Sequence, residues 1–198
     1  AVMMAQHAIQ EPFAMINADD FYGREAFEVM AQFLQSQAVD SSNYCIVGYK
    51  LDNTLSDHGS VNRGEIHTDE KGNLTFITER HKIRRTPEGV VFEEEDGIHP
   101  IVSMNMMVCT PTLFDYGEEY FIEFLKAKGQ EMKSEFYVPR LLDLAIKDKG
   151  VTVEVLSSDA TWFGVTYRED KPFVQENLAK LSENGIYPTP LWTGVRAK

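Results

Sequence analysis

Short apolar runs alternate with amphipathic segments along most of the chain. Three of these runs, at residues 12–17, 43–49 and 101–109, lack the alternation of a half-exposed strand, which is typical of strands buried on both faces of a sheet. Between the first two, residues 24–37 carry apolar side chains at helical spacing. This order predicts a βαβ crossover unit, whose ligands bind beyond the carboxyl ends of its strands.

The other segments predict a single continuous α/β unit. Turn residues at 69–73 separate two strand-like segments, which predicts an antiparallel pair. We also predict a helix at the N-terminus, strands at residues 90–94, 151–156 and 161–166, and helices at residues 112–128, 136–147 and 170–184. Internal repeats and flexible linkers are absent from the sequence, so we expect one unit over residues 1–198.

Composition narrows the class of protein. Hydrophobic residues make up 43% of the 198 residues, which argues against disorder, and the net charge of −12 argues against a nucleic-acid partner. No apolar run is long enough for a membrane span. Cys45 and Cys109 each lie in an apolar run, so we expect two reduced, buried thiols and a cytoplasmic location.

The polar segment at residues 17–23 is the first candidate site. Asp19 and Asp20 lie just after a buried run, where a carboxylate holds a hard cation such as Mg²⁺ while substrate phosphates supply further ligands. An aspartate at this position also caps the following helix. With two adjacent aspartates, both roles fit.

Two further polar segments are candidates for ligand contacts. The loop at residues 57–64 has glycines that permit close backbone approach and donors suited to hydroxyl groups or phosphate, and a solvated loop is the alternative. In residues 78–82, Glu79 would accept sugar hydroxyls while Arg80 or Lys82 meets a phosphate. An exposed run of charges is the alternative there.

Asn105 interrupts the apolar run at residues 101–109. A polar amide at a buried strand position needs partners, so Asn105 either bonds to the backbone or faces a ligand. The five histidines lack the spacing of zinc ligands, and neither cysteine has a histidine nearby in sequence. A metalloprotease or a thiol nucleophile therefore has little support.

Taken in order, these segments resemble the sugar nucleotidyltransferase (NDP-sugar pyrophosphorylase) family. The resemblance runs from PFAMINADDFYG through GSVNRG, TERHK, VSMNMMV and SEFYVP to WFGVTY. It implies a three-layer α/β/α fold with a mixed, mainly parallel sheet. It also implies attack of a sugar 1-phosphate oxygen on the α-phosphorus of an NTP, with release of pyrophosphate.

The resemblance implies substrate-binding roles for several residues. Gly59 matches a glycine whose backbone contacts the sugar, and Asn105 resembles a sugar-contacting asparagine. Glu79 resembles a glutamate that binds sugar hydroxyls, with Arg80 in the place of a phosphate-binding lysine. We also expect Lys82 to bind the substrate, as a second cation beside Arg80.

The metal site implied by the resemblance is only partly present. Asp19 takes the place of the strand-end aspartate that holds the catalytic Mg²⁺. Gly164 falls where many members have a second metal-binding aspartate, and Asp170 is the candidate replacement. A glycosyltransferase of related fold usually has an Asp-x-Asp motif, whereas here the two aspartates are adjacent.

The start of the sequence suggests a fragment. The Gly-rich loop that holds the NTP in this family is absent, and Ala1 corresponds to a point well inside the family domain. We therefore expect the sugar-phosphate half of the domain, lacking the first strands of the sheet and having little turnover alone. The alternative is a non-catalytic sugar-phosphate-binding or regulatory module. The base, the sugar and whether the protein is a homo-oligomer are left open.

Overall fold

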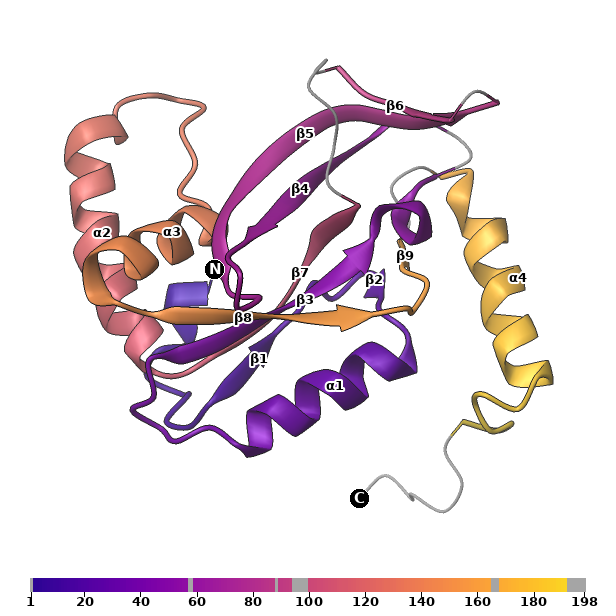
Figure 1. The fold of residues 1–198 in the computed structure, drawn as a ribbon, viewed down its shortest axis with the longest axis horizontal. Helices are drawn as coiled ribbons and strands as arrows, with labels where there is room; N and C mark the ends of the chain where they lie inside the picture. Colours follow the sequence, from indigo (N-terminus) through magenta and orange to yellow (C-terminus); the bar gives the residue numbers. More distant parts are fainter. Residues whose placement is uncertain (1, 57–58, 88, 94–99, 165–167, 192–198) are drawn as a thin grey trace.

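In the computed structural model, which describes residues 2–56, 59–87, 89–93, 100–164 and 168–191, helices cover both faces of a curled sheet (Figure 1). The helices are η1 Val2–Ala5, α1 Arg24–Gln35, η2 Leu51–Thr54, α2 Thr112–Lys128, α3 Val138–Lys149 and α4 Asp170–Glu183, where η marks a 3-10 helix. The strands are β1 Phe13–Met15, β2 Asp20–Phe21, β3 Asn43–Lys50, β4 Val61–Thr68, β5 Leu74–Thr86, β6 Gly89–Val91, β7 Ile101–Cys109, β8 Thr152–Ser158 and β9 Phe163–Gly164. None of the described helices is long and apolar enough to cross a membrane.

The main sheet is mixed, as the sequence predicts. Its strand order is β6-β5-β4-β7-β3-β8, with β1 paired to β7, while β2 and β9 form a separate two-stranded sheet. Among the described pairs of the main sheet, β3 and β8 run parallel and the others run antiparallel. The expectation of a mainly parallel sheet is therefore wrong for this part of the chain, because β7 runs against each of its neighbours.

Strand β7 changes partner halfway along its length. Its first half pairs with β4 (Gly64 opposite Ser103), and its second half pairs with β1 (Ala14 opposite Val108). β1 and β3 are both antiparallel to β7, so they are parallel to each other and joined by α1. The predicted crossover unit is thus present, but β7 lies between its two strands. A ligand site is expected where neighbouring strands diverge in this way.

Two apolar cores pack on the two faces of the sheet. Alternate residues of β3 point to opposite faces, so Val47 packs in the core covered by α1 and Ile46 in the core covered by α2 and α3. This arrangement confirms the three layers. Both cysteines are free and buried, as predicted.

Most predicted element bounds agree with the structure to within a few residues. The helix at residues 112–128 and the strand at residues 101–109 are confirmed to the residue. The N-terminal segment forms the short η1 rather than a longer helix. β1 is only partly buried, contrary to the prediction, because β7 is its sole partner among the described strands. Residues 165–167 of the predicted last strand lie outside the described residues.

Candidate functional site

A polar cleft lies at the point where the pairing partner of β7 changes from β4 to β1. It consists of two adjoining cavities of about 940 and 250 Å³, which we call together the central cleft. Six residues line both cavities: Asn17, Asn62, Ile77, Glu79, Asn105 and Pro139. The cleft therefore gathers residues from the end of β1, from β4, β5 and β7, and from the start of α3.

Asn105 lies at an irregularity in β7. Between Ile46 and Gly48 of β3, the register on β7 moves from Met107 to Ser103, so β7 has two extra residues there. Asn105 has a φ of 59°, a left-handed conformation that asparagine tolerates better than most residues. This bulge turns the amide out of the apolar core and into the central cleft. The side chain of Asn105 therefore lines the cleft, and its contact with a ligand stays a prediction.

Glu79 and Gly64 line the smaller cavity of the cleft from β5 and β4. They are register partners on β5 and β4, and an added Cβ at Gly64 would lie 2.8 Å from Cγ2 of Ile77 and 3.9 Å from Oε2 of Glu79. Glycine at this position thus keeps the space beside the carboxylate open. Gly59 instead lines a separate surface cavity with Arg84. The glycine beside the cleft is Gly64, the other glycine of the predicted loop at residues 57–64, which the structure places within β4.

Asp20, rather than Asp19, lines the central cleft. Asn17 donates from Nδ2 to Oδ2 of Asp20 over 2.9 Å, and the Tyr22 hydroxyl lies 3.3 Å from the same oxygen. That hydroxyl also lies 2.8 Å from the carbonyl oxygen of Met104, and burial raises the pKa of Tyr22. Asp19 is exposed in the turn before β2. The chain thus fixes the second aspartate of the pair and leaves the first in solvent.

Arg63 brings a positive charge to the same cleft. Its guanidinium is held by the main-chain oxygen and the hydroxyl of Thr54, and its carbon Cζ lies 4.8 Å from the ring centre of Trp162. Burial lowers the pKa of Arg63 to about 10, an effect that Asp20 and Glu79 partly oppose. Arg63 therefore carries its charge near pH 7.

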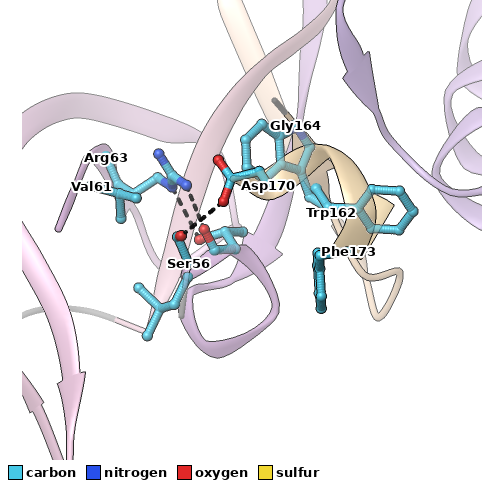
Figure 2. Close-up of a pocket in the computed structure, with 10 residues that line it drawn as sticks. Ser56, Val61, Arg63, Trp162, Gly164, Asp170 and Phe173 are labelled. Carbon is cyan, nitrogen blue, oxygen red and sulfur yellow. Dashed lines mark hydrogen bonds between the residues drawn. The ribbon is translucent and has the colours of Figure 1, made fainter. Parts of the chain in front are cut away.

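Asp170 lies apart from the central cleft. It is buried at the first residue of α4, where the Ser56 hydroxyl donates to its Oδ1 over 3.4 Å. This aspartate lines a small side cavity of about 30 Å³ together with Arg63 and Gly164. Figure 2 shows these three residues around the cavity. Neither Asp19 nor Asp170, the two residues expected at the metal, lines the central cleft.

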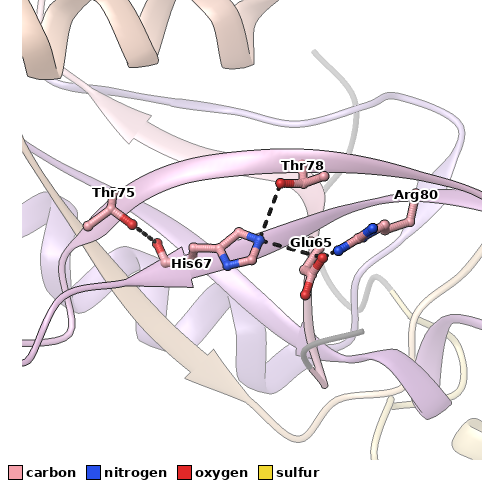
Figure 3. Close-up of polar contacts among 5 residues, drawn as sticks. All are labelled: Glu65, His67, Thr75, Thr78 and Arg80. Carbon is pink, nitrogen blue, oxygen red and sulfur yellow. Dashed lines mark hydrogen bonds and ion pairs between the residues drawn. The ribbon is translucent and has the colours of Figure 1, made fainter. Parts of the chain in front are cut away.

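The cations predicted to bind phosphate have carboxylate partners. Arg80 is buried, and its Nε donates to Oε2 of buried Glu65 over 2.6 Å (Figure 3). Lys82 is exposed at a bulge of β5, where its Nζ lies 2.8 Å from Oε1 of Glu93. Neither residue lines the central cleft. Strand alternation explains the placement of Arg80, because Glu79 and Arg80 project from opposite faces of β5.

The acidic residues of the cleft can bind only a cation whose other ligands are water or substrate groups. The described residues contain no cluster of three or more His, Cys, Asp or Glu side chains that could hold a metal ion. Asp20 offers Oδ1, because its Oδ2 accepts from Asn17. Mg²⁺ is commonly bound through one or two carboxylates with water and substrate phosphates as further ligands, so this donor set fits it.

Solved structures with similar folds are sugar-phosphate nucleotidyltransferases. The inositol-1-phosphate CTP transferase from T. maritima matches 92% of this chain with a TM-score of 0.55 and 14% identity. A putative glucose-1-phosphate thymidylyltransferase from Bacillus anthracis matches 89% with a TM-score of 0.54 and 9% identity. UTP-bound UGPase from Acinetobacter baumannii matches 92% with a TM-score of 0.53 and 13% identity. This chain has the nucleotidyltransferase fold.

The chain spans about three fifths of the length of these nucleotidyltransferases, with 61%, 58% and 55% of the three proteins covered. No protein-family model matches the sequence, and no curated protein matches it significantly. The similarity is therefore one of fold, at identities below those that carry an activity from one protein to another.

Proposed function

We propose that this chain forms the sugar-phosphate-binding part of a nucleotidyltransferase that acts on an NTP and a sugar 1-phosphate. The observation that carries the proposal is the meeting of Asp20, Glu79 and Asn105 in one cleft of a nucleotidyltransferase fold. These side chains come from three separate strands, and the bulge in β7 serves to turn Asn105 toward the other two. Such convergence of polar groups in a cavity is typical of a ligand site.

The cleft offers the contacts that a phosphorylated sugar needs. Glu79 would accept hydrogen bonds from sugar hydroxyls, and the amide of Asn105 would both donate and accept. In the reaction, a phosphate oxygen of the sugar 1-phosphate attacks the α-phosphorus of the NTP. The bond from the α-phosphorus to the bridging oxygen breaks, and pyrophosphate leaves with the electron pair. Positioning and charge neutralisation account for most catalysis of this kind.

Mg²⁺ is the metal that we propose for this site. Asp20 would be the residue of this chain that binds it, and Asn17 would orient the Asp20 carboxylate. When bound, Mg²⁺ neutralises negative charge on the reacting phosphates. Tyr22 and Asn17 keep the Asp20 carboxylate turned toward the cleft before any ligand arrives. Asp19 and Asp170 have no part in this arrangement.

The second candidate is a non-catalytic module that binds a sugar phosphate or a nucleotide sugar. Gly164, the register partner of Asp20, favours it, because a second carboxylate at that position would strengthen a cation site. Both candidates use the same cleft. They differ in whether an NTP is consumed when the sugar 1-phosphate is bound.

We infer a cytoplasmic location from the two cysteines. Cys45 and Cys109 are free thiols in the apolar interior, as is usual for proteins in reducing compartments. The net charge of −12 is consistent with small phosphorylated ligands and Mg²⁺ rather than nucleic acid as partners.

Calorimetric titration with glucose 1-phosphate in the presence of Mg²⁺ tests the proposed site. We expect Glu79→Gln and Asn105→Gly each to weaken binding by about 10-fold, as loss of one or two hydrogen bonds would. Asn105→Gly suits the left-handed backbone at this position, so its effect on binding is separable from an effect on folding. Glu70→Gln, in the exposed turn between β4 and β5, is the matched control and should bind as the wild type does.

Two further results would decide between the candidates. Pyrophosphate release from an NTP that depends on the sugar 1-phosphate supports the enzyme, whereas binding of the sugar phosphate with no NTP consumption by the full-length protein supports the module. If Glu79→Gln and Asn105→Gly bind glucose 1-phosphate as tightly as the wild type, the central cleft is not the sugar-phosphate site.

A further inference from the structure

Arg63 is a buried cation held by neutral groups. Only 9% of the residue is exposed. Nε donates to Oγ1 of Thr54 over 3.2 Å, Nη2 donates to the main-chain oxygen of Thr54, and Nη1 donates to the main-chain oxygen of Asn62 over 2.7 Å. The Trp162 ring packs against the guanidinium, which fixes its plane. These contacts hold the group rigidly without neutralising its charge.

Arg63 has no carboxylate oxygen within 4.0 Å among the residues that the structure describes, since none of the ion pairs found there includes it. Buried charges in proteins are normally paired, because removing an ion from water is expensive. Buried Arg80 follows that rule through its ion pair with Glu65. Arg63 departs from it and lines the smaller cavity of the central cleft, whereas the exposed Arg140 lines the larger cavity.

The position of Arg63 suits its charge to binding an anionic ligand. It lines the smaller cavity of the central cleft, together with Asp20 and Glu79. A guanidinium carries five N–H groups, and three of them are engaged with Thr54 and Asn62. Two N–H groups are left on the planar fork whose geometry matches a phosphate. Asp20 and Glu79 would repel a phosphate, so the cleft needs a cation to bind one.

We propose that Arg63 is the phosphate-binding residue of the central cleft and takes the phosphate monoester of the sugar ligand. This inference rests on the proposed function and deepens it, because it assigns the phosphate end of the ligand to the Arg63 side of the cleft. The sugar hydroxyls then lie toward Glu79 and Asn105. Arg80, which the sequence favours for this role, serves instead as the partner of buried Glu65.

Calorimetric titrations with glucose 1-phosphate, glucose and inorganic phosphate test the assignment. We expect Arg63→Gln to raise the Kd for glucose 1-phosphate by about 10- to 100-fold, as loss of charge-assisted hydrogen bonds would. The affinity for glucose should stay unchanged. Arg84→Gln removes an exposed arginine of β5 that does not line the cleft, so this control should bind glucose 1-phosphate as the wild type does.

Arg63→Lys keeps the inference testable if Arg63→Gln fails to fold. Lysine retains the charge but loses the planar fork, so we expect a smaller increase in Kd for glucose 1-phosphate that grows with ionic strength. Thermal unfolding of each variant establishes that it is folded. Folded Arg63 variants that bind glucose 1-phosphate with the wild-type Kd would overturn the assignment while leaving the proposed function intact.

Inorganic phosphate separates failure of this inference from failure of the proposed function. If the wild type binds none of a panel of sugar 1-phosphates that includes glucose 1-phosphate, the proposed function fails. The role of Arg63 is then tested by the binding of inorganic phosphate alone. An increase in the melting temperature of the wild type with phosphate, reduced in Arg63→Lys and Arg63→Gln, would still support an anion site at Arg63. Equal effects of phosphate on wild type and variants, or none on either, would refute it.

Discussion

Asp20 and Gly164 face each other across the two-stranded β2–β9 sheet, and a Cβ added to Gly164 would lie 2.7 Å from Oδ1 of Asp20. The same Cβ would also lie 3.0 Å from the ring of Trp162. Glycine therefore sets the position of the carboxylate that points into the central cleft. Any side chain at residue 164 must displace either the Asp20 carboxylate or the indole.

Gly164→Ala should consequently weaken Mg²⁺-dependent binding of glucose 1-phosphate and lower the free energy of unfolding by about 1 kcal/mol, the usual effect of a side chain forced out of its preferred rotamer. Calorimetry and urea unfolding measure the two effects. In Asp20→Asn/Gly164→Ala, the losses in binding should not add, because both changes act on the same carboxylate. Additive losses would show that Gly164 acts through Trp162 instead.

The two adjacent aspartates should respond differently to neutralisation. We expect Asp20→Asn to weaken binding of glucose 1-phosphate in the presence of Mg²⁺ by about 10-fold or more and to have little effect in its absence. Asp19→Asn is the matched control, because Asp19 is exposed and does not line the cleft. Titrations with and without Mg²⁺ distinguish the two. A larger effect from Asp19→Asn would restore the assignment that the family resemblance implies.

The buried Glu65–Arg80 pair should contribute to stability rather than to binding. Glu65→Gln leaves Arg80 without the carboxylate 2.6 Å away, and breaking a buried pair in this way typically lowers the free energy of unfolding by about 3 kcal/mol or more. Glu93→Gln breaks the exposed pair between Glu93 and Lys82, a residue on the same strand as Arg80. It should change the free energy of unfolding by less than about 1 kcal/mol. Chemical unfolding compares the two variants. Equal effects would contradict the difference in burial.

Stability should decline at alkaline pH because buried groups keep their protons only in the folded state. Burial raises the pKa of Cys45 from 9.0 to about 12, and it also raises the pKa values of Tyr22, Tyr44 and Tyr49 above 10.0. Above about pH 9, the unfolded chain therefore binds fewer protons than the folded chain, and the free energy of unfolding falls as pH rises.

Urea unfolding between pH 7 and about pH 10.5 measures this decline. Each of these groups lowers the free energy of unfolding by about 1.4 kcal/mol for every pH unit above its pKa in the unfolded chain. Cys45→Ala removes one of the titrating groups, so its curve should fall less steeply than that of the wild type. A free energy of unfolding that stays constant from pH 7 to about pH 10.5 would contradict the effect of burial on these groups.

The sequence predicted much of the secondary structure but not the pairing of the strands. Apolar runs and helical spacing located β3, β7, α1 and α2 because those patterns depend on residues close in sequence. The insertion of β7 between β1 and β3 joins segments far apart in the chain, and no local pattern encodes it. The prediction of a mainly parallel sheet was wrong for that reason.

For the candidate site, the segments chosen from the sequence do reach the central cleft, but often through a different residue than the one expected. Glu79 and Asn105 lie in the cleft, whereas Asp20 and Gly64 take the places expected for Asp19 and Gly59. A glycine inside a strand pattern was a signal for Gly64. No comparable signal distinguished Asp20 from Asp19, because the choice depends on register with β9 across more than a hundred residues.

The sequence by itself determined the elements, the buried thiols and the family that the chain resembles, since these follow from local patterns of polarity and from the order of motifs. The tertiary structure alone decided which charges are available to a ligand. Burial and cross-strand pairing hold Arg80 in an ion pair with Glu65. Arg63 lines the cleft and has no ion pair with any residue that the structure describes. The physical reason is that the energy of a charge depends on the groups packed around it, and folding brings those groups from distant parts of the chain.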